Sequence, residues 1–271
     1  MIRWLISLVC ICLVWAVGIN EVAIAQTSST PTITERQLKQ GEKTAQKAIQ
    51  AANKGDFVQA EKYWTELIED FPDNPAVWSN RGNIRVSQNK LDEAIADFNQ
   101  SIEIADRYPD PYLNRGIAYE GKKLWQNALD DYNRVLAINP QDAMAYNNRG
   151  NAKAGQENWP EALTDYLKAV EIAPDFALAR ANAALMTYQV GDRPSALRQM
   201  RNLVRKYPMF PDMRAALTAV LWTEGQQGEA ESNWVAAVGI DNRYQDLDWV
   251  KTIRRWPPQM VEALEKFLTL N

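Results

Sequence analysis

Four asparagines recur at a constant interval of 34 residues and define the chemistry that this chain offers: Asn80, Asn114, Asn148 and Asn182. A side-chain amide both donates and accepts hydrogen bonds, so a row of amides can hold the main chain of an extended peptide whatever its sequence. The residues that we expect to share this surface are Asn83, Asn147, Asn151, Met144, Leu178, Leu185 and Trp222. We therefore predict a nearly neutral peptide-binding surface. The alternative is that the asparagines hydrogen-bond neighbouring segments and bind no partner.

Catalytic residue types are scarce in the chain. It has no histidine, which removes the commonest general base and the commonest metal ligand. Carboxylate neighbours such as Asp130 and Asp131 are adjacent on a predicted helix, so they point in different directions and cannot share a substrate. The segment Gly41–Thr44 lacks the glycines of a phosphate-binding loop. We therefore expect no enzyme activity, no cofactor, no metal site and no small-molecule substrate.

The segment 109–142 shows which elements carry the asparagines, because it predicts a pair of helices. The spaced apolar or small residues are Tyr112, Gly116 and Tyr119 on the first helix and Ala128, Tyr132, Val135 and Leu136 on the second. Gly121, Lys122 and Lys123 interrupt the pattern between the helices, and Pro140 ends the second one. We expect Gly116 and Ala128 to be small because the two helices cross there. One hairpin cannot cover both apolar stripes, so the pairs must stack.

The spacing of six of these positions resembles the tetratricopeptide repeat (TPR): Tyr112, Gly116, Tyr119, Ala128, Tyr132 and Pro140. Six consecutive units share the pattern in phase, and they span residues 41–74, 75–108, 109–142, 143–176, 177–210 and 211–244. The resemblance implies an all-α solenoid, a right-handed superhelix of helix-turn-helix repeats. It also implies a protein or peptide partner in a concave groove lined by the first helices, where the asparagines resemble the ladder of the O-linked N-acetylglucosamine transferases.

TPR proteins that bind chaperone C-terminal tails use a carboxylate clamp of lysine, arginine and asparagine. The matching positions, starting from the second unit, hold Ser79, Asn83, Asn114, Met144 and Asn148. The asparagines fit the clamp but every cation is missing, so a terminal carboxylate would have no charge partner. We therefore expect the C-terminal carboxylate clamp to be absent.

Two charged series also follow the repeat interval. Arginines precede three of the glycines, and aspartates precede the large apolar residue of each second helix; the series are Arg81, Arg115 and Arg149, and Asp97, Asp131 and Asp165. We predict structural Arg–Asp pairs within or between adjacent units. The formal net charge of −4 argues against a nucleic-acid partner.

The N-terminal residues 1–25 carry Arg3, an apolar run from Trp4 to Val17 and a small-x-small exit at Ala23–Ala25, which is typical of a secretory signal peptide. An uncleaved membrane anchor is the alternative, although the run is shorter than the roughly 20 residues of a membrane span. Cleavage would remove Cys10 and Cys12 and leave no cysteine for disulfide, thiolate or zinc–thiolate chemistry. Residues 26–33 are predicted to be a flexible linker, and a capping box at Thr34 begins the repeat region 34–244.

Residues 245–271 do not form a seventh unit and are predicted to be C-terminal capping helices. A short helix around 248–253 precedes two prolines, and the final helix carries one apolar stripe: Met260, Val261, Leu264, Phe267 and Leu268. This tail resembles that of exported TPR proteins of cyanobacteria and of the chloroplast lumen.

Together these patterns predict an exported scaffold of the periplasm or thylakoid lumen. Its concave groove would bind an extended peptide or protein segment, as an adaptor or assembly factor with a possible membrane-complex partner. The alternative function is a structural subunit or self-associating repeat protein whose groove is filled by its own tail or by another copy.

Overall fold

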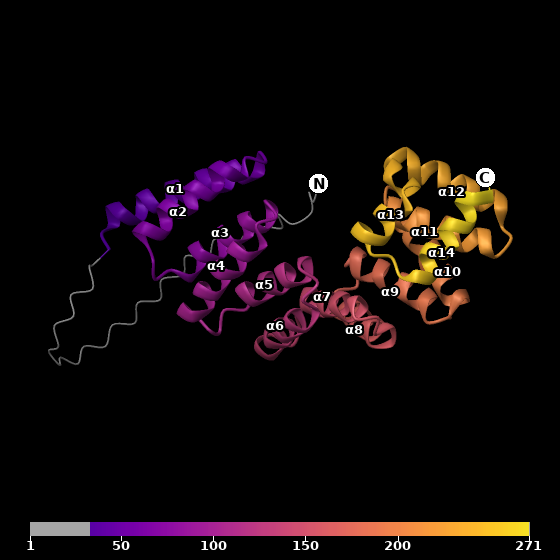
Figure 1. The fold of residues 1–271 in the computed structure, drawn as a ribbon, viewed down its shortest axis with the longest axis horizontal. Coiled ribbons are helices and arrows are strands. Elements are labelled where there is room, and N and C mark those ends of the chain that lie inside the picture. Colours follow the sequence, from indigo (N-terminus) through magenta and orange to yellow (C-terminus); the bar gives the residue numbers. More distant parts are fainter. Residues whose placement is uncertain (1–32, 271) are drawn as a thin grey trace. The chain divides into compact units, whose positions relative to one another are not determined.

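A computed structural model describes residues 33–270, which divide into a part ending at Asp106 and a part beginning at Arg107. The predicted signal peptide 1–25 and the linker up to residue 32 lie outside the described residues. The first part holds two helical hairpins that pack together through α2 and α3 (Figure 1). They are formed by α1 (Glu35–Asn53), α2 (Phe57–Asp70), α3 (Pro75–Ser87) and α4 (Leu91–Ile104).

The second part continues the same pattern with four hairpins. Its helices are α5 (Pro109–Gly121), α6 (Trp125–Ile138), α7 (Ala143–Gly155), α8 (Trp159–Ile172), α9 (Ala177–Gln189), α10 (Arg193–Lys206), α11 (Pro211–Thr223) and α12 (Gln227–Ile240). Within this part each second helix packs against the first helix of the next hairpin. The described residues contain helices and no strands, as the predicted all-α class requires.

In the second to fourth units, an aromatic ring of the second helix packs directly against a glycine of the first helix. A methyl group added to Gly116 would lie 2.5 Å from the ring of Tyr132, and the same close approach joins Gly82 to Phe98. The Tyr132 ring is therefore the group nearest to Gly116, and its position requires a glycine there. Ala128 is itself fully buried, so it leaves no room for a larger side chain either.

The turn inside each hairpin has one residue in the left-handed region, and it occupies the same repeat position throughout. These residues are Gly55, Asn89, Lys123, Glu157, Gly191 and Gly225. Gly121 was expected to interrupt the helical pattern, but it is the last residue of α5, and Lys123 makes the turn with φ of 59°. The repeat position rather than the nearest glycine therefore fixes where the chain reverses.

The N-terminal cap of the first helix confirms a local sequence prediction. The Thr34 side chain accepts from the Gln37 backbone, and the Gln37 side chain accepts from the Thr34 backbone, which forms the predicted capping box. Among the described residues, no helix is both long and apolar enough to span a bilayer.

The C-terminal residues form a short 3₁₀ segment at Asn242–Gln245, α13 (Leu247–Trp249), a π-helical turn at Val250–Arg254 and α14 (Pro258–Leu270). The final helix packs mainly against α11 and also contacts α9, the first helices of the sixth and fifth hairpins (Figure 1). Met260, Leu264 and Phe267 of its predicted apolar stripe are buried. The predicted cap therefore covers the first-helix side of two hairpins rather than only the end of the stack.

Candidate functional site

The arginine and aspartate series pair within each hairpin, as the sequence predicts. Arg81 pairs with Asp97 at 2.8 Å, Arg115 pairs with Asp131 at 2.6 Å, and Arg149 pairs with Asp165 at 2.7 Å. In each pair the aspartate lies on the second helix and is almost completely buried. Because each arginine is paired with a buried aspartate, these charges stabilise the hairpins and do not form a ligand site.

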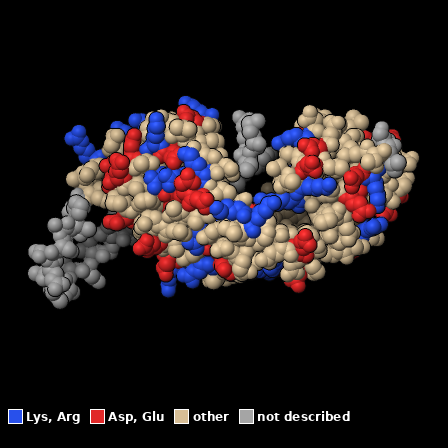
Figure 2. Space-filling view, viewed as in Figure 1, with Lys and Arg blue, Asp and Glu red and all other residues tan. Residues whose placement is uncertain are grey.

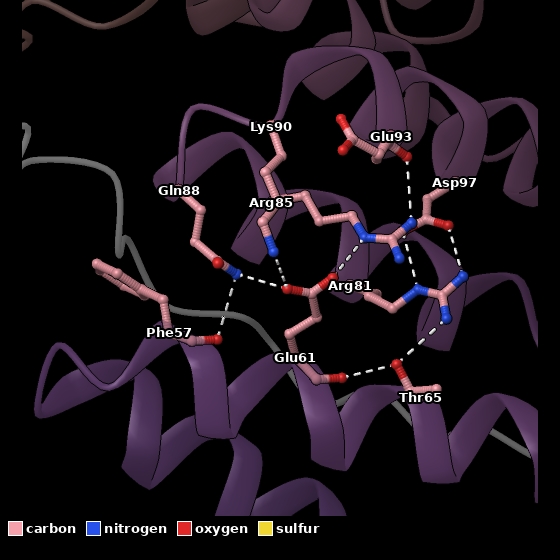
Figure 3. Close-up of polar contacts among 9 residues, drawn as sticks. All are labelled: Phe57, Glu61, Thr65, Arg81, Arg85, Gln88, Lys90, Glu93 and Asp97. Atoms are coloured by element: carbon pink, nitrogen blue, oxygen red, sulfur yellow. Dashed lines mark hydrogen bonds and ion pairs between the residues drawn. The ribbon is translucent and has the colours of Figure 1, made fainter.

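In the first part the pair belongs to a network that joins two hairpins (Figure 3). Arg85 bridges Glu61 of α2 and Asp97 of α4, with both distances at 2.9 Å. Glu61 also accepts from Gln88 and Lys90. Although partial burial raises the pKa of Glu61, hydrogen bonds from Lys90, Arg85 and Gln88 lower it to about 2. This network therefore holds the first and second hairpins together.

In the second part four of the predicted asparagines form one hydrogen-bonded cluster, hereafter the amide cluster: Asn147, Asn148, Asn151 and Asn182. Asn182 Nδ2 donates to Asn147 Oδ1 at 3.0 Å and to Asn151 Oδ1 at 3.4 Å, and Asn147 Nδ2 donates to Asn148 Oδ1 at 3.1 Å. Tyr166 O–H donates to Asn151 Oδ1 at 3.0 Å. The amides therefore cross-link the fourth and fifth hairpins.

The amide cluster still has unused hydrogen-bonding atoms. Asn148 Nδ2, Asn151 Nδ2 and Asn182 Oδ1 have no partner among the described residues. The described part also contains no buried side-chain polar atom that lacks a partner, so these three atoms reach the surface. The cluster thus offers two donors and one acceptor beyond the bonds that hold its own structure together.

The remaining predicted asparagines are open. The side-chain amides of Asn80 and Asn83 on α3 and of Asn114 on α5 are half-buried and have no hydrogen-bond partner in the described ranges. The predicted asparagines therefore differ in whether their amides already hydrogen-bond within the protein. The amides of α3 and α5 are free, whereas those of α7 and α9 also serve the packing of the repeats.

The apolar residues predicted for the binding surface divide in the same way. Met144 and Leu178 are exposed, at 37% and 45% of their full area. Leu185 was expected at the surface, but it is buried in the core formed around α9 and α11, because its helix is covered there. Trp222 was also expected to contact a partner, yet its ring packs edge-on against Phe267 of α14 at 5.2 Å. The chain's own tail therefore occupies that position.

Asp212, at the start of α11, is the anchor of the tail. It is 2% exposed and accepts hydrogen bonds from Tyr244, Arg254 and Trp256, at 2.7, 2.9 and 3.0 Å. These three donors lie in the segment that precedes α14, so one buried carboxylate fixes the path of the chain. Nothing in the repeat pattern marks Asp212 for this role.

A second tail contact reaches the third hairpin. Arg255 Nη1 lies 3.2 Å from Glu120 Oε2, and the guanidinium carbon lies 5.6 Å from the centre of the Trp125 ring. Tyr132 O–H donates to the other oxygen of Glu120 at 2.6 Å. Burial raises the pKa of Glu120 to about 7, against the lowering effects of Tyr132 and Arg255. Sequence reasoning missed both residues because they belong to no repeated series.

The described residues hold no cluster of side chains that could ligate a metal. On the face shown in Figure 2, Lys and Arg side chains gather in a band across the middle of the view, and acidic side chains lie on either side of it. Of the side chains predicted for the binding surface, the open amides and the exposed Met144 and Leu178 remain for a ligand, and the tail adds the half-exposed Arg255.

Comparisons with known proteins agree with this architecture. A family model described as "TPR repeat" matches residues 82–123, and one described as "Tetratricopeptide repeat" matches residues 109–142 and 143–176. No curated protein sequence matches the chain.

Solved structures resemble the fold. A TPR protein from Parabacteroides merdae ATCC 43184 is 20% identical, with 86% of this chain and 98% of that chain covered and a TM-score of 0.64. YrrB, described as a TPR protein with an unusual peptide-binding site, is 19% identical, with 75% and 97% covered and a TM-score of 0.54. A thermophilic TPR protein of Thermus thermophilus is 18% identical, with 67% and 99% covered and a TM-score of 0.57. With its paired helices at a 34-residue interval and family-model matches between residues 82 and 176, the chain contains tetratricopeptide repeats and has an all-α TPR fold.

Proposed function

We propose that this chain binds an extended peptide or protein segment across the first helices of its repeats and acts as an adaptor or assembly factor for an extracytoplasmic or thylakoid protein complex. The observation that carries the proposal is the amide cluster, whose atoms Asn148 Nδ2, Asn151 Nδ2 and Asn182 Oδ1 are unused. An extended main chain presents both N–H and C=O groups, and two donors beside one acceptor match that alternation. Such a surface does not depend on the partner's side chains for its main-chain contacts.

Asn114 extends the binding surface along the same part of the chain. Its amide is free of internal hydrogen bonds, so contact with a partner would cost no existing bond. Met144 and Leu178 add exposed apolar area beside the amides on α7 and α9. Residues of this kind suit recognition of a protein segment, and we infer no catalytic role for the chain.

The alternative function, in which the chain's own tail fills the surface, is favoured for the last two repeats. Phe267 packs against Trp222, and Gln259 forms two hydrogen bonds with Gln189 at the end of α9. The adaptor proposal therefore concerns the surface from α5 to Asn182, and the structural role concerns the surface beyond it.

An experiment on single asparagines tests the proposal. The purified protein is presented with an array of unrelated ten-residue peptides, and the tightest binders are measured by calorimetry. Asn114→Ala should weaken binding by about two- to tenfold, because one net hydrogen bond contributes about 0.5–1.5 kcal/mol. It should leave the melting temperature unchanged, since Asn114 has no internal partner. Asn127→Ala on the outward second helix α6 is the matched control and should change neither quantity.

The outcomes separate the two functions. Equal affinities for wild type and Asn114→Ala, with both folded, would exclude this amide from the binding surface. Absence of any binding peptide for the wild type would reject the adaptor and favour the structural subunit.

The export part of the proposal rests on the N-terminal sequence alone. Expression with residues 1–25 in a secreting host should yield a mature chain that starts at Gln26, and intact mass measurement checks the cleavage. A chain retained at full length in the membrane fraction would instead support the uncleaved anchor.

A further inference from the structure

Arg255 is a cation that the repeats do not supply. It belongs to the tail, and its guanidinium lies over the Trp125 ring at the start of α6. That ring packs against Gly155 of α7, where an added methyl group would lie 2.7 Å from its atoms. The tail thus places one guanidinium on an aromatic ring that is packed between two hairpins.

Most of the hydrogen-bonding capacity of Arg255 is unused. A guanidinium has five N–H donors, and the only polar contact of Arg255 in the described part of the chain is the one from Nη1 to Glu120. Its side chain retains 48% of its exposed area. Because burial raises the pKa of Glu120 to about 7, that carboxyl neutralises only part of the arginine's charge near neutral pH.

The backbone conformation of Arg255 is unfavourable for an arginine. Its φ of 53° lies in the left-handed region, at the end of the π-helical turn, where the Trp256 N–H donates to the Val250 carbonyl. Glycine usually fills such a position because it has no Cβ.

Arg255 lies near the amide cluster, because the Trp125 ring beneath its guanidinium packs at Gly155 of α7, four residues after Asn151. Tyr166 donates to Asn151 of that cluster, and the charges of Glu120 and Arg255 both act on the Tyr166 hydroxyl, the first opposing and the second favouring its ionisation. A peptide whose main chain lies over Asn148, Asn151 and Asn182 would therefore have the guanidinium of Arg255 beside it.

Resting on the proposed peptide-binding function, we infer that Arg255 is a specificity-determining residue that selects a glutamate or aspartate side chain in the bound segment. The carboxylate would use the N–H groups that Glu120 leaves free, in a charge-assisted hydrogen bond. The nearby cations of α7 do not compete for this carboxylate, because Arg149 and Lys153 are both paired with Asp165. The free N–H groups of Arg255 beside neutral amides therefore give the surface a preference for acidic segments.

An internal side chain fits this cation better than a chain terminus. The positions that would clamp a terminal carboxylate hold Ser79, Asn83, Asn114, Met144 and Asn148, none of which is cationic. A terminus at Arg255 would meet one guanidinium only, and the main chain would end instead of continuing over the amides. The partner that we expect is therefore a continuous extended segment with an acidic residue.

The test uses the purified full chain and ten-residue peptides of alanine and serine, acetylated and amidated so that they have no terminal charges. Each peptide carries one glutamate, and its partner carries glutamine at the same position. At the best position the wild type should bind the glutamate peptide about five- to tenfold more tightly, and the preference should shrink in 0.5 M salt. Arg255→Gln should remove the preference, Arg255→Lys should keep part of it, and Lys251→Gln, which alters an exposed cation on the same tail, should leave it unchanged.

The outcomes distinguish this inference from the function on which it rests. Equal binding of glutamate and glutamine peptides by the wild type overturns the role of Arg255 and leaves the adaptor intact. Failure of both peptides, and of every peptide in the array, overturns the adaptor and the inference together. A preference that persists in folded Arg255→Gln, or one that needs an uncapped C-terminus instead of an internal glutamate, also overturns the inference. The wild-type comparison and the Arg255→Lys variant each test the inference without Arg255→Gln, so the inference can still be rejected if that variant misfolds.

Discussion

Arg255 pairs with Glu120 although 135 positions separate the two residues in the chain. The pair joins the tail to the third hairpin, whereas Asp212 joins the same tail to the sixth. Two carboxylates at distant points of the repeat array therefore fix one short segment. The tail is thus tied to the third hairpin as well as being a cap for the core of the last two.

The first prediction concerns pH. Burial raises the pKa of Glu120 from 4.5 to about 7 in the folded chain, so the folded state binds more protons than the unfolded state between these values. The resulting stabilisation is fully present below pH 4.5 and is lost as the pH rises through 7. Glu120→Gln cannot titrate, so its unfolding free energy should change less with pH, by up to about 1.4 kcal/mol per pH unit. Urea titrations from mildly acidic to mildly basic pH measure the unfolding free energy of the wild type and of Glu120→Gln. The same pH dependence in both proteins would contradict the prediction.

The second prediction compares two of the internal ion pairs. Arg115→Leu leaves the buried Asp131 with no cation among its contacts and should cost about 3–5 kcal/mol. Arg149→Leu leaves Asp165 paired with Lys153 at 2.7 Å and should cost less. The loss in the first variant should shrink in mildly acidic solution, because Asp131 can then take up a proton. Chemical denaturation of both variants decides it, and equal losses at neutral pH would show that Lys153 does not compensate.

The third prediction concerns the glycine that faces an aromatic ring. Gly116→Ala places a methyl group 2.5 Å from the Tyr132 ring, which is fully buried and cannot move away freely. Overpacking of this kind should cost about 1–3 kcal/mol. Gly228→Ala is the matched control, since a methyl group there meets nothing within 4 Å and a helical alanine should add about 0.5–1 kcal/mol. Opposite shifts of the melting temperature are expected, and a stabilised Gly116→Ala would refute the packing argument.

The fourth prediction uses the left-handed turn position. Lys123 and Glu157 adopt φ of 59° and 62°, which costs a residue with a Cβ about 1–2 kcal/mol. Glycine removes this strain but gains freedom in the unfolded chain, so Lys123→Gly and Glu157→Gly should each stabilise by up to about 1 kcal/mol. Asn89→Gly should gain less, because asparagine tolerates this conformation. Thermal melts of the three variants test the order, and destabilisation by glycine would contradict it.

The sequence by itself determined the features that arise within one repeat. The Arg–Asp pairs 16 residues apart lie within one hairpin, and the helix starts recur at intervals of 34 residues. Such contacts join residues close in the chain, and the same pattern recurs in neighbouring hairpins, so each copy reinforces the interpretation of the others. The apolar stripe of α14 was equally predictable, since helical periodicity is a local property.

Only the tertiary structure decided where the unrepeated residues lie. The four-residue amide cluster depends on how α7 and α9 pack together, so the sequence could list its asparagines without showing which of their atoms stay free. Leu185 and Trp222 lost their predicted exposure because α14 returns over the first helices of the last two hairpins. The contacts of Asp212 and Glu120 with the tail link residues 32 to 135 positions apart. A contact of that kind depends on the summed packing of everything between its two residues, and no local period encodes it.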